Sequence, residues 1–370
     1  MKFNCQQQAL TKALNIVSKA ISSKNTIPIL KGILLKVSPE GMLTLAASDL
    51  DLSIENKLPV SSYEEGAVVV SARLFGDIIR KLPPEEVTVE AEDGANVKIS
   101  CLASEFSIVG QPADEFPSMG EIKKEQTLLL EKELLKSMIR KTAFSASIEE
   151  SKGIITGILT EIEEEKITMV ALDGFRMAIA RENVKNKEKK KIIISARIMG
   201  EINKILSELE EDEEITLYLD EKKAVVIAED TKMMLRLLEG EFIKYKDILP
   251  KEYGTRIKAV RGELLNSIER ASLLAREGKN NLIKLALEED RMVITSRSEE
   301  GNVREEVFVE KEGPSLEIGF NSKYIMDVMK AVSDEEIAME FNSSVSPCLI
   351  KPVSGEQFEY LVLPVRISSN

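Results

Sequence analysis

The sequence contains no histidine and no tryptophan, and it has only three cysteines among 370 residues. The lack of histidine removes the commonest general base and the commonest metal ligand. Cys5, Cys101 and Cys348 lie far apart in the chain. An odd, unclustered set of cysteines is typical of reduced thiols in a cytosolic protein, and not of a disulfide framework or a metal site. We therefore expect a cytoplasmic protein without a bound metal or other cofactor.

Long apolar runs are also missing. No segment approaches the roughly 20 consecutive apolar residues that a membrane-spanning helix needs, and the first residues, MKFNCQQQ, lack the hydrophobic stretch of a signal peptide. We expect no membrane partner. Asp and Glu outnumber Lys and Arg by 63 to 50, which gives a net charge of −13. Spread evenly, that charge would disfavour binding to nucleic acid.

What the sequence does contain is an internal repeat. Residues 42–55 (MLTLAASDLDLSIE) resemble 166–180 (KITMVALDGFRMAIA), and 67–82 (AVVVSARLFGDIIRKL) resemble 191–206 (KIIISARIMGEINKIL). Asp49 and Asp173 are 124 residues apart, as are the serines of the second pair of segments. A shared offset over separate segments indicates a repeat. A third, more diverged copy follows after about 126 residues and places Asn321 where the others have serine.

Periodicity predicts the same elements twice in each repeat: strand, helix and three strands. Alternation at Ile167, Met169 and Ala171 predicts a half-buried strand before a turn at Asp173-Gly174. Ser71 is expected to cap a helix, with Asn321 as its counterpart in the third copy. The predicted helices cover residues 10–21, 72–82, 131–143, 196–206, 262–275 and 321–332. Residues 185–191 are expected to form an exposed loop, and the last strand is expected at 358–367.

The predicted fold class is α+β, with three tandem domains at 1–122, 127–250 and 251–370. Taken with their flanking basic residues, the six helices carry a net charge of +10, so the remainder of the chain carries −23. The second helix of each repeat places charges at positions i, i+4 and i+7, which puts them on one helical face. These stripes are Arg73-Asp77-Arg80, Arg197-Glu201-Lys204 and Lys323-Asp327-Lys330. A similar stripe joins Lys132, Lys136 and Arg140.

An ordinary solvated face would explain one such stripe, but recurrence in every repeat favours a shared functional surface. A strand-rich unit with helices on one side has sheet edges that need to be covered, and units joined edge to edge into a ring cover them. Helices on the inside would give such a ring an electropositive wall that fits duplex nucleic acid. Few aromatic residues and no base-reading motif predict binding without sequence specificity. The residues expected to face DNA are Lys12, Lys24, Arg73, Arg80, Lys136, Arg140, Arg197 and Lys204.

Several motifs in order resemble the beta subunit of bacterial DNA polymerase III, the sliding clamp. They are TIPIL at 26–30, SAR at 71–73, DEFP at 114–117, LDGFRMA at 172–178, IGFNSKYIMDV at 318–328 and LVLPVRI at 361–367. The resemblance spans essentially the whole chain. It implies three clamp domains per chain and a head-to-tail homodimer that closes into a ring around duplex DNA, with helices lining the hole. It further implies a polymerase processivity factor that is loaded by a clamp loader and is not itself an enzyme.

The resemblance also implies a protein-binding pocket between the second and third domains, for the replicative polymerase and for repair proteins that carry the clamp-binding motif. The matching positions are Ile155, Leu172, Gly174, Phe175, Arg176, Met177, Ile243, Ile248, Asn321, Tyr324, Val345, Pro347, Leu361, Leu363, Pro364, Val365 and Arg366. Leu172 and Phe175 stand where many members have Thr and His, which implies a more apolar pocket. For the dimer interface, Phe106 matches a position in the first domain, and Leu273 and Leu274 match the opposing apolar pair in the third.

Two other functions remain open from the residues alone. The first is a hydrolase that uses two carboxylates, Asp49 and Asp173, as acid and base. Each of these lies in a repeated turn, where aspartate is common for backbone reasons. No nucleophile motif or phosphate-binding glycine loop accompanies them. The second alternative is a scaffold that binds peptides and never touches DNA.

Overall fold

The computed structural model describes residues 1–370 except 23–24, 93–95, 121–125, 186–188, 210–213 and 368–370. The chain divides into two compact units. Unit 1 consists of residues 1–135 and 200–237, and unit 2 consists of residues 136–199 and 238–370. The division falls within helices α3 (Lys132–Thr142) and α4 (Ala196–Glu208), so the central repeat contributes to both units. The predicted limits of three domains do not coincide with this division and remain a prediction.

Unit 1 contains the first repeat and, from the second repeat, the segments up to residue 135 and from 200 to 237. Its helices are α1 (Gln7–Val17) and α2 (Ala72–Lys81). Its strands are β1 (Lys2–Gln6), β2 (Gly32–Val37), β3 (Met42–Ser48), β4 (Leu52–Pro59), β5 (Ser61–Glu64), β6 (Gly66–Ser71), β7 (Glu86–Glu92), β8 (Asn96–Cys101), β9 (Ser104–Gln111), β10 (Gln126–Glu131), β15 (Glu214–Leu219), β16 (Lys223–Ala228) and β17 (Thr231–Arg236). Except for β5, which the sequence patterns did not predict, the first repeat follows the expected order of elements.

Unit 2 contains the other half of the second repeat and all of the third. Its helices are α5 (Arg261–Ala275) and α6 (Ser322–Ala331). Its strands are β11 (Gly157–Ile162), β12 (Lys166–Leu172), β13 (Arg176–Asn183), β14 (Lys190–Ser195), β18 (Thr255–Val260), β19 (Leu282–Leu287), β20 (Arg291–Ser298), β21 (Gly301–Glu312), β22 (Leu316–Asn321), β23 (Glu336–Phe341), β24 (Cys348–Pro352) and β25 (Phe358–Val362).

Each unit has one continuous antiparallel arrangement of strands across a repeat junction. In unit 1, β4 of the first repeat pairs with β17 of the second, for example Ile54 with Met233. In unit 2, β13 of the second repeat pairs with β25 of the third, for example Met177 with Leu361. The edges that the sequence predicted to be covered are therefore covered by strand pairing between consecutive repeats. This pairing satisfies backbone groups that an isolated repeat would leave exposed.

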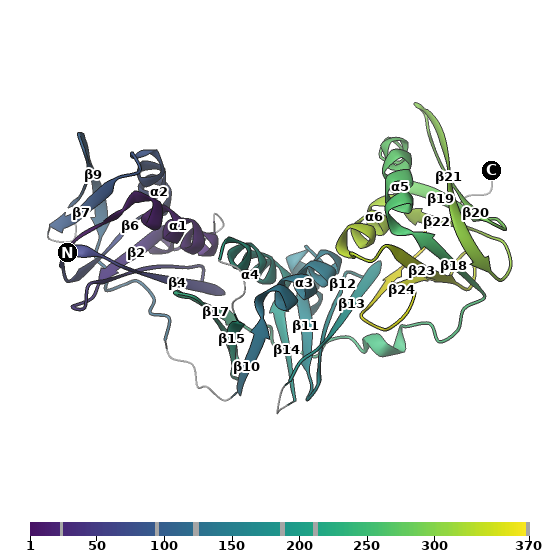
Figure 1. Ribbon diagram of the computed structural model, residues 1–370, viewed down its shortest axis with the longest axis horizontal. Helices are drawn as coiled ribbons and strands as arrows, with labels where there is room; N and C mark the ends of the chain where they lie inside the picture. The colour runs from purple at the N-terminus through teal and green to yellow at the C-terminus, as the bar shows by residue number, and fades with distance from the viewer. Residues whose placement is uncertain (23–24, 93–95, 121–125, 186–188, 210–213, 368–370) are drawn as a thin grey trace. The chain divides into compact units, whose positions relative to one another are not determined.

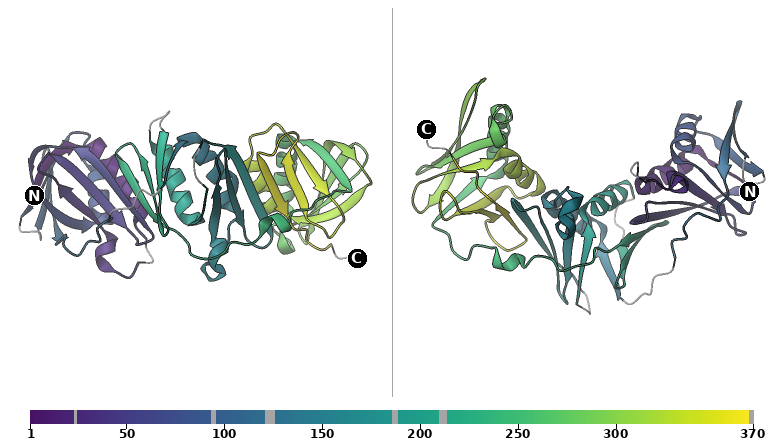
Figure 2. Two further views of the ribbon diagram at one scale, coloured as in Figure 1. Left: turned by 90° about the horizontal axis from the view of Figure 1, so that it is seen from below. Right: turned by 180° about the vertical axis from the view of Figure 1, so that it is seen from behind.

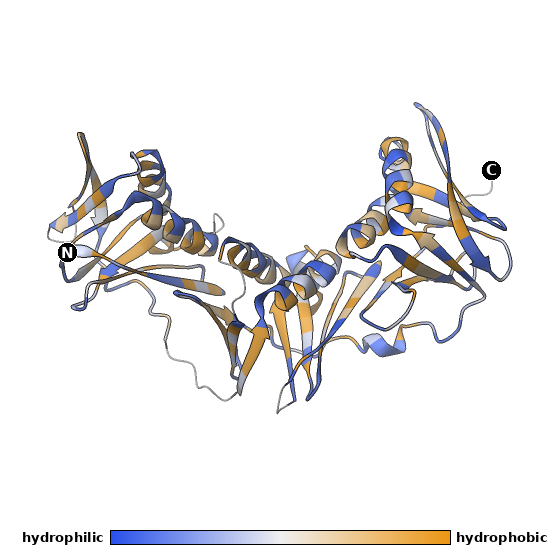
Figure 3. Ribbon diagram, in the orientation of Figure 1, coloured by the Kyte–Doolittle hydropathy of each residue, from blue (hydrophilic) through white to orange (hydrophobic). Residues whose placement is uncertain are grey.

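The helices lie side by side in pairs on one face of each sheet, α1 with α2 and α5 with α6 (Figures 1 and 2). Their apolar residues recur every three or four positions, so each helix buries one stripe against the sheet. In α1 and α2 this stripe includes Leu10, Leu14, Phe75 and Ile79, all fully buried. The ribbons of these helices accordingly alternate between hydrophobic and hydrophilic residues (Figure 3). Among the described residues, no helix is long and apolar enough to cross a membrane.

The predicted helix caps are confirmed. The Ser71 side chain accepts a hydrogen bond from the backbone N–H of Leu74 at 3.4 Å, at the start of α2. Asn321 accepts one from the backbone N–H of Lys323 at 3.0 Å, at the start of α6. A side-chain oxygen here satisfies a donor that has no partner within the helix. Serine and asparagine therefore both act as the N-cap of the second helix, at equivalent positions of the first and third repeats.

Three sequence expectations were wrong. Strand β12 is buried on both faces, not half-buried, because Phe242 and Tyr245 cover the face that carries Val170 and Leu172. The last strand ends at Val362 and not at 367, since Pro364 has no backbone N–H to continue a ladder. The expected loop at 185–191 is shorter at its end, where Lys190 and Lys191 already belong to β14, and its residues 186–188 lie outside the described part of the chain.

Candidate protein-binding surface and nucleic-acid interface

The turn between β12 and β13 is held by Asp173. Its Oδ1 accepts hydrogen bonds from the backbone N–H groups of Phe175 at 2.8 Å and Arg176 at 3.0 Å. Gly174, with φ of +96°, supplies a left-handed conformation that favours glycine. The result is a rigid turn whose Phe175 side chain is 55% exposed.

Arg176 connects this turn to α6. Its guanidinium donates to Asp173 at 3.0 Å and to Asp327 at 2.6 Å, and only 9% of the side chain is exposed. The same group lies 4.6 Å from the ring centroid of Tyr324 and 5.3 Å from that of Phe144. Two carboxylates and two aromatic faces thus compensate one largely desolvated cation.

A stacked aromatic pair, of which Phe175 is exposed and Tyr324 is half-buried, lies beside this arginine. The rings of Phe175 and Tyr324 stack with centroids 6.4 Å apart and an interplanar angle of 25°. The ammonium of Lys152 lies 6.0 Å from the Phe175 centroid. Burial, and next the negative charge of Asp173, raise the pKa of the Tyr324 hydroxyl, although Arg176 and Lys152 oppose that shift. The phenol therefore stays neutral, and this part of the surface is apolar with a cationic rim.

The segment after β25 completes the surface. The backbone N–H of Leu363 donates to the carbonyl of Phe175 at 2.9 Å, and that of Val365 donates to the carbonyl of Gly319 at 2.8 Å. A side chain at Gly319 would place its Cβ 2.7 Å from the Val365 carbonyl oxygen, so this close approach requires glycine. Residues 363–365 are thereby held between the β12–β13 turn and β22.

The residues proposed from sequence for the protein-binding pocket divide by exposure. Leu172, Met177 and Leu361 are buried and pack with Phe242 and Tyr245, so they contribute to the core. The more apolar pocket expected from Leu172 therefore has to come from Phe175 alone. Exposed members are Gly174, Phe175, Ile243, Ile248, Val345, Leu363 and Arg366, and half-buried members are Ile155, Arg176, Asn321, Tyr324, Pro347, Pro364 and Val365.

The sequence missed three residues that shape this surface: Phe144, Lys152 and Asp327. Asp327 was visible as the acidic member of the third charged stripe, where it was interpreted as part of a DNA-facing surface. Its carboxylate instead holds Arg176. Phe144 and Lys152 follow α3 in a stretch without regular periodicity, so no pattern pointed to them.

The charged stripes on the second helices are partly neutralised. On α2, Asp77 pairs with Arg80 at 2.8 Å, and on α4, Glu201 pairs with Lys204 at 2.8 Å. On α6, Lys330 pairs with Glu269 of α5 at 2.7 Å. The ordinary interpretation of a salt-bridged face is thus correct for one base in each stripe.

The other basic residues proposed for DNA contact lie mainly on helix surfaces. Arg73, Arg140 and Arg197 are exposed, and Lys136 is half-buried. Lys12 is exposed and lies 3.8 Å from Glu229. Lys24 lies outside the described residues. Such exposed pairs are weak and exchangeable, so they leave these side chains able to meet phosphates.

Two strands present unpaired edges bearing apolar side chains. Over 104–109, β9 pairs with β8 on one side, and among the described residues it has no strand partner on the other. The same holds for β21 over 301–308, which pairs with β20 there and turns to β18 only beyond Phe308. Phe106 is 41% exposed and Leu273, on α5, is 63% exposed, whereas Leu274 is half-buried.

Comparison with known proteins decides the family. Models of the DNA polymerase III beta subunit match three consecutive parts of the chain: the N-terminal domain at 1–120, the central domain at 129–244 and the C-terminal domain at 246–366. The chain belongs to the DNA polymerase III beta subunit family. The beta sliding clamp of Staphylococcus aureus is 34% identical, with 99% of each chain covered.

Solved structures of clamps agree with this assignment. The sliding clamp of Bacillus subtilis superposes with a TM-score of 0.95 at 32% identity, with both chains covered completely. A putative DNA polymerase III beta subunit from Eubacterium rectale gives a TM-score of 0.94 at 34% identity and covers 99% of this chain and 100% of its own. The fold is therefore that of a three-domain clamp, and the chain is a processivity factor for DNA polymerase.

Membership of the clamp family also argues against the two alternative functions, the hydrolase and the peptide-binding scaffold. The family is an accessory subunit without catalysis of its own. In agreement, Asp49 uses its Oδ1 to accept backbone N–H groups of Asp51 and Leu52, at 3.1 and 2.8 Å, as Asp173 does in the second repeat. Both aspartates therefore stabilise turns. The scaffold that never binds DNA is likewise disfavoured.

Proposed function

We propose that two copies of this clamp chain join head to tail into a ring that encloses duplex DNA and slides along it without sequence specificity. The observation that carries the proposal is the division of charge, with net +10 on the helices and their flanking basic residues and −23 on the rest. Phosphates bind the helices through weak, replaceable contacts, and the acidic remainder repels DNA elsewhere. Arg73, Arg80, Lys12, Lys24, Lys136, Arg140, Arg197 and Lys204 make these contacts.

The unpaired strand edges support the dimer. An exposed strand edge with apolar side chains is a template for pairing with another strand. We assign Phe106 on β9 to one side of the interface, and Leu273 and Leu274 on α5 to the other. Because the two sides differ, the contact is heterologous, and it must close into a ring or grow into a filament.

The exposed residues around Phe175 bind partner proteins. An extended peptide fits there, with apolar side chains meeting Phe175, Tyr324 and Leu363. Its occupants are the replicative polymerase, the clamp loader and repair proteins that share one motif. A polymerase held in this way keeps a high effective concentration at the primer end, which is the physical basis of processivity. The clamp works in the cytoplasm, where bacterial DNA is replicated.

The test is retention on circular DNA. The clamp is loaded onto a closed circle by a bacterial clamp loader, and the bound fraction is followed after the circle is cut. We expect retention on the intact circle and rapid loss after cutting, because enclosure and not affinity holds the ring. Equal loss rates before and after cutting would contradict enclosure.

A triple variant tests the assignment of the helices. Arg73→Ala, Arg197→Ala and Lys204→Ala together should lower the loaded fraction and shorten retention on the circle. Peptide binding at Phe175 should stay unchanged in the same protein, which shows that its fold is intact. A scaffold that does not use DNA would lose neither property.

A further inference from the structure

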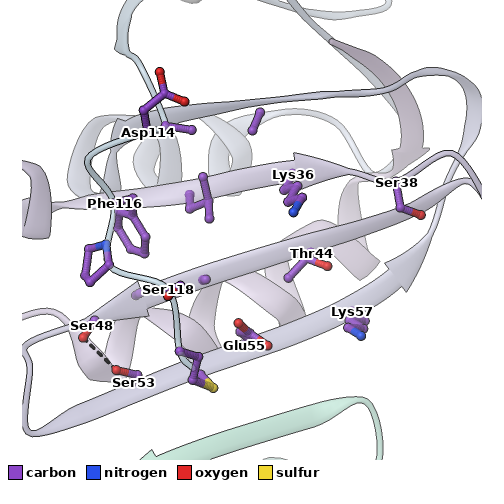
Figure 4. Close-up of a pocket in the computed structure, with 17 residues that line it drawn as sticks. Lys36, Ser38, Thr44, Ser48, Ser53, Glu55, Lys57, Asp114, Phe116 and Ser118 are labelled. Atoms are coloured by element: carbon purple, nitrogen blue, oxygen red, sulfur yellow. Dashed lines mark hydrogen bonds between the residues drawn. The ribbon is translucent and has the colours of Figure 1, made fainter. Parts of the chain in front are cut away.

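The first repeat contains a cavity of about 530 Å³ on the face of its sheet that points away from the helices (Figure 4). Its floor is formed by alternate residues of three neighbouring strands, among them Lys36 of β2, Ala46 of β3 and Ser53 of β4. The chain segment 113–119 passes over one side, with Phe116 against the floor (Figure 4). A volume of this size is within the range of sites that bind small ligands or a few residues of a peptide.

The second repeat has an equivalent place. Strand register equates the first-repeat pair Leu34–Ala46 with Leu159–Val170. Phe116 packs on Ala46 and Val69, and Phe242 packs in the cluster that contains Val170 and Ile193. In both repeats, therefore, the chain crosses the same face of the sheet and inserts a phenylalanine at the same point.

In the second repeat this place is filled. Tyr245 is only 4% exposed, and its hydroxyl donates to Glu161 at 2.7 Å. The floor there carries Val170 and Met177, whereas the first repeat has Ala46 and Ser53 at these positions. Met119 stands three residues after Phe116, as Tyr245 does after Phe242, but it packs against Val225 and Met234. The cavity thus arises from smaller floor residues and a missing aromatic ring, in a class of structure that normally leaves few voids.

The charges of the two places also differ. In the second repeat, Glu161 lies between Lys191 and Thr168 in the strand register and pairs with Lys191 at 3.5 Å. The equivalent first-repeat position holds Lys36. In the next strand but one, Lys57 stands where the second repeat has Arg181, which pairs there with Glu359. Neither lysine forms an ion pair with any residue that the structure describes. The carboxylates of the cavity are Glu55, in the neighbouring row of the sheet, and Asp114, which lies apart from Lys57 (Figure 4).

We propose that this cavity is a second protein-binding site, which takes a short segment of a partner protein with an aromatic residue beside an acidic one. The aromatic ring takes the space that Tyr245 fills in the second repeat. The acidic side chain meets Lys36 and Lys57, where the second repeat supplies its own carboxylate. Shape complementarity follows from the smaller floor residues of the first repeat. Charge complementarity follows from Lys36, which stands in place of Glu161, and from Lys57, which forms no ion pair with the described residues, whereas its counterpart Arg181 is paired with Glu359. The site lies wholly within unit 1 and does not depend on the surface around Phe175.

The experiment uses the intact clamp and the blocked peptide acetyl-Glu-Asp-Tyr-Asp-amide. Methyl NMR of protein labelled at methionine and alanine follows Met119 and Ala46 during a titration. We expect saturable shifts concentrated at these two methyl groups. Replacing the three acidic residues of the peptide by lysine, or its tyrosine by alanine, should abolish them. Absence of saturable shifts with the parent peptide, or equal binding of the lysine peptide, would overturn the proposal.

Protein variants locate the site. Lys36→Glu restores the carboxylate of the second repeat and should weaken binding by at least about tenfold. Lys222→Glu makes the same charge change on an exposed turn outside the cavity and should leave binding within about twofold, since exposed charges apart from the site are screened by salt. Ser53→Met refills the floor and should also remove binding. Melting temperature and solution mass confirm that each variant is folded.

A variant of the other surface separates the two sites. Phe175→Ala should leave binding of the acidic peptide unchanged even where it weakens partners of the proposed function. If Phe175→Ala removes the shifts at Met119, or if Lys36→Glu binds as well as the native protein, then the cavity is not the binding site.

Discussion

At the scale of residues, Arg176 is the clearest case of one side chain holding several parts together. Its guanidinium contacts a turn, a helix and two aromatic rings. Together these partners shield the guanidinium from water. Removing one partner of such a group lowers the free energy of unfolding by more than the intact pair contributes to it. The reason is that the remaining charges stay buried without compensation.

We therefore expect Arg176→Ala to lower the free energy of unfolding by about 2–3 kcal/mol. Asp173 and Asp327 would lose their shared cation, and Tyr324 would lose the group that lies against its ring. Urea denaturation followed by circular dichroism measures the change. Lys152→Ala, which removes an exposed cation from the same surface, should cost less than about 0.5 kcal/mol. Similar losses for the two variants would contradict this account.

A second residue-scale prediction concerns alkaline pH. Burial raises the pKa of the Cys5 thiol from 9.0 to about 12. The unfolded chain loses this proton near pH 9 while the folded chain keeps it, so the folded state binds more protons and stability falls as pH rises. Between pH 9 and pH 10 the thiol should account for a loss of about 1 kcal/mol.

Urea denaturation at a series of pH values checks this. The Cys5→Ala variant should show a shallower decline above pH 9 than the native protein, with little difference between the two slopes at pH 7–8. Parallel curves up to pH 11 would mean that the Cys5 thiol loses its proton at the same pH in the folded and unfolded chains.

Local chemistry was the part of the site that the sequence could predict. The turn role of Asp49 and Asp173 and the caps at Ser71 and Asn321 depend on a few neighbouring residues, so a motif suffices. The burial of Leu172 was not predictable in this way. It depends on Phe242 and Tyr245, which lie some seventy residues further on and reach the strand only in the folded chain.

At the scale of elements, the helix caps show how a repeat keeps a function while changing a residue. We expect Ser71→Ala to cost about 1 kcal/mol, because the N–H of Leu74 would lose its partner at the start of α2. Ser71→Asn should recover most of that loss, since asparagine is the cap in the third repeat. Thermal melting of the two variants makes the comparison, and equal melting temperatures would refute the role of the cap.

A second element-scale prediction concerns the segment after β25. Gly319→Val would force its side chain against the Val365 carbonyl and break the hydrogen bond from Val365 to residue 319. Amide hydrogen exchange at Val365 should become much faster. Gly200→Ala is the matched control, because no atom lies within 4 Å of its added Cβ and alanine favours helix. Unchanged protection at Val365 in the valine variant would show that the contact does not hold the segment.

Helices and most strands followed from periodicity, because each element buries one regular stripe. The exceptions were elements whose pairing partners are distant. Strand β5 is entirely exposed and carries no apolar pattern, and it exists because it pairs with β1. The end of β25 was placed five residues too late, because Leu363 and Val365 are apolar yet bond to a turn and to β22 instead of a ladder.

At the scale of the whole molecule, the separation of charge and the unpaired edges were the main deductions from sequence. The first came from counting charges over the predicted helices, and the second came from the repeat. Composition did not reveal that one base of each stripe is already paired with a neighbouring acid, because side-chain geometry within a helix face is not fixed by spacing.

The proposed dimer gives a prediction at this scale. Phe106→Arg with Leu273→Arg should place charges on both sides of the interface and reduce the solution mass from twice 41.2 kDa to 41.2 kDa. Sedimentation equilibrium measures the mass. Ile148→Arg, a change at a side chain that is 97% exposed and lies on neither edge, should leave it unchanged. A native protein that is monomeric at micromolar concentration would contradict a stable ring.

Because strands pair across the repeat junctions, the segment that repeats in the sequence is not the segment that forms a compact unit in this protein. One copy of the repeat runs from β1 to β9. Each compact unit, however, extends over a repeat junction, through the pairing of β4 with β17 in unit 1 and of β13 with β25 in unit 2. A fragment that ends at residue 122 would lack β17, so its β4 edge would be unpaired and the fragment would be prone to self-association. A new copy added to such a chain can be accommodated only if its last strand pairs with the sheet of its predecessor, as β17 and β25 do.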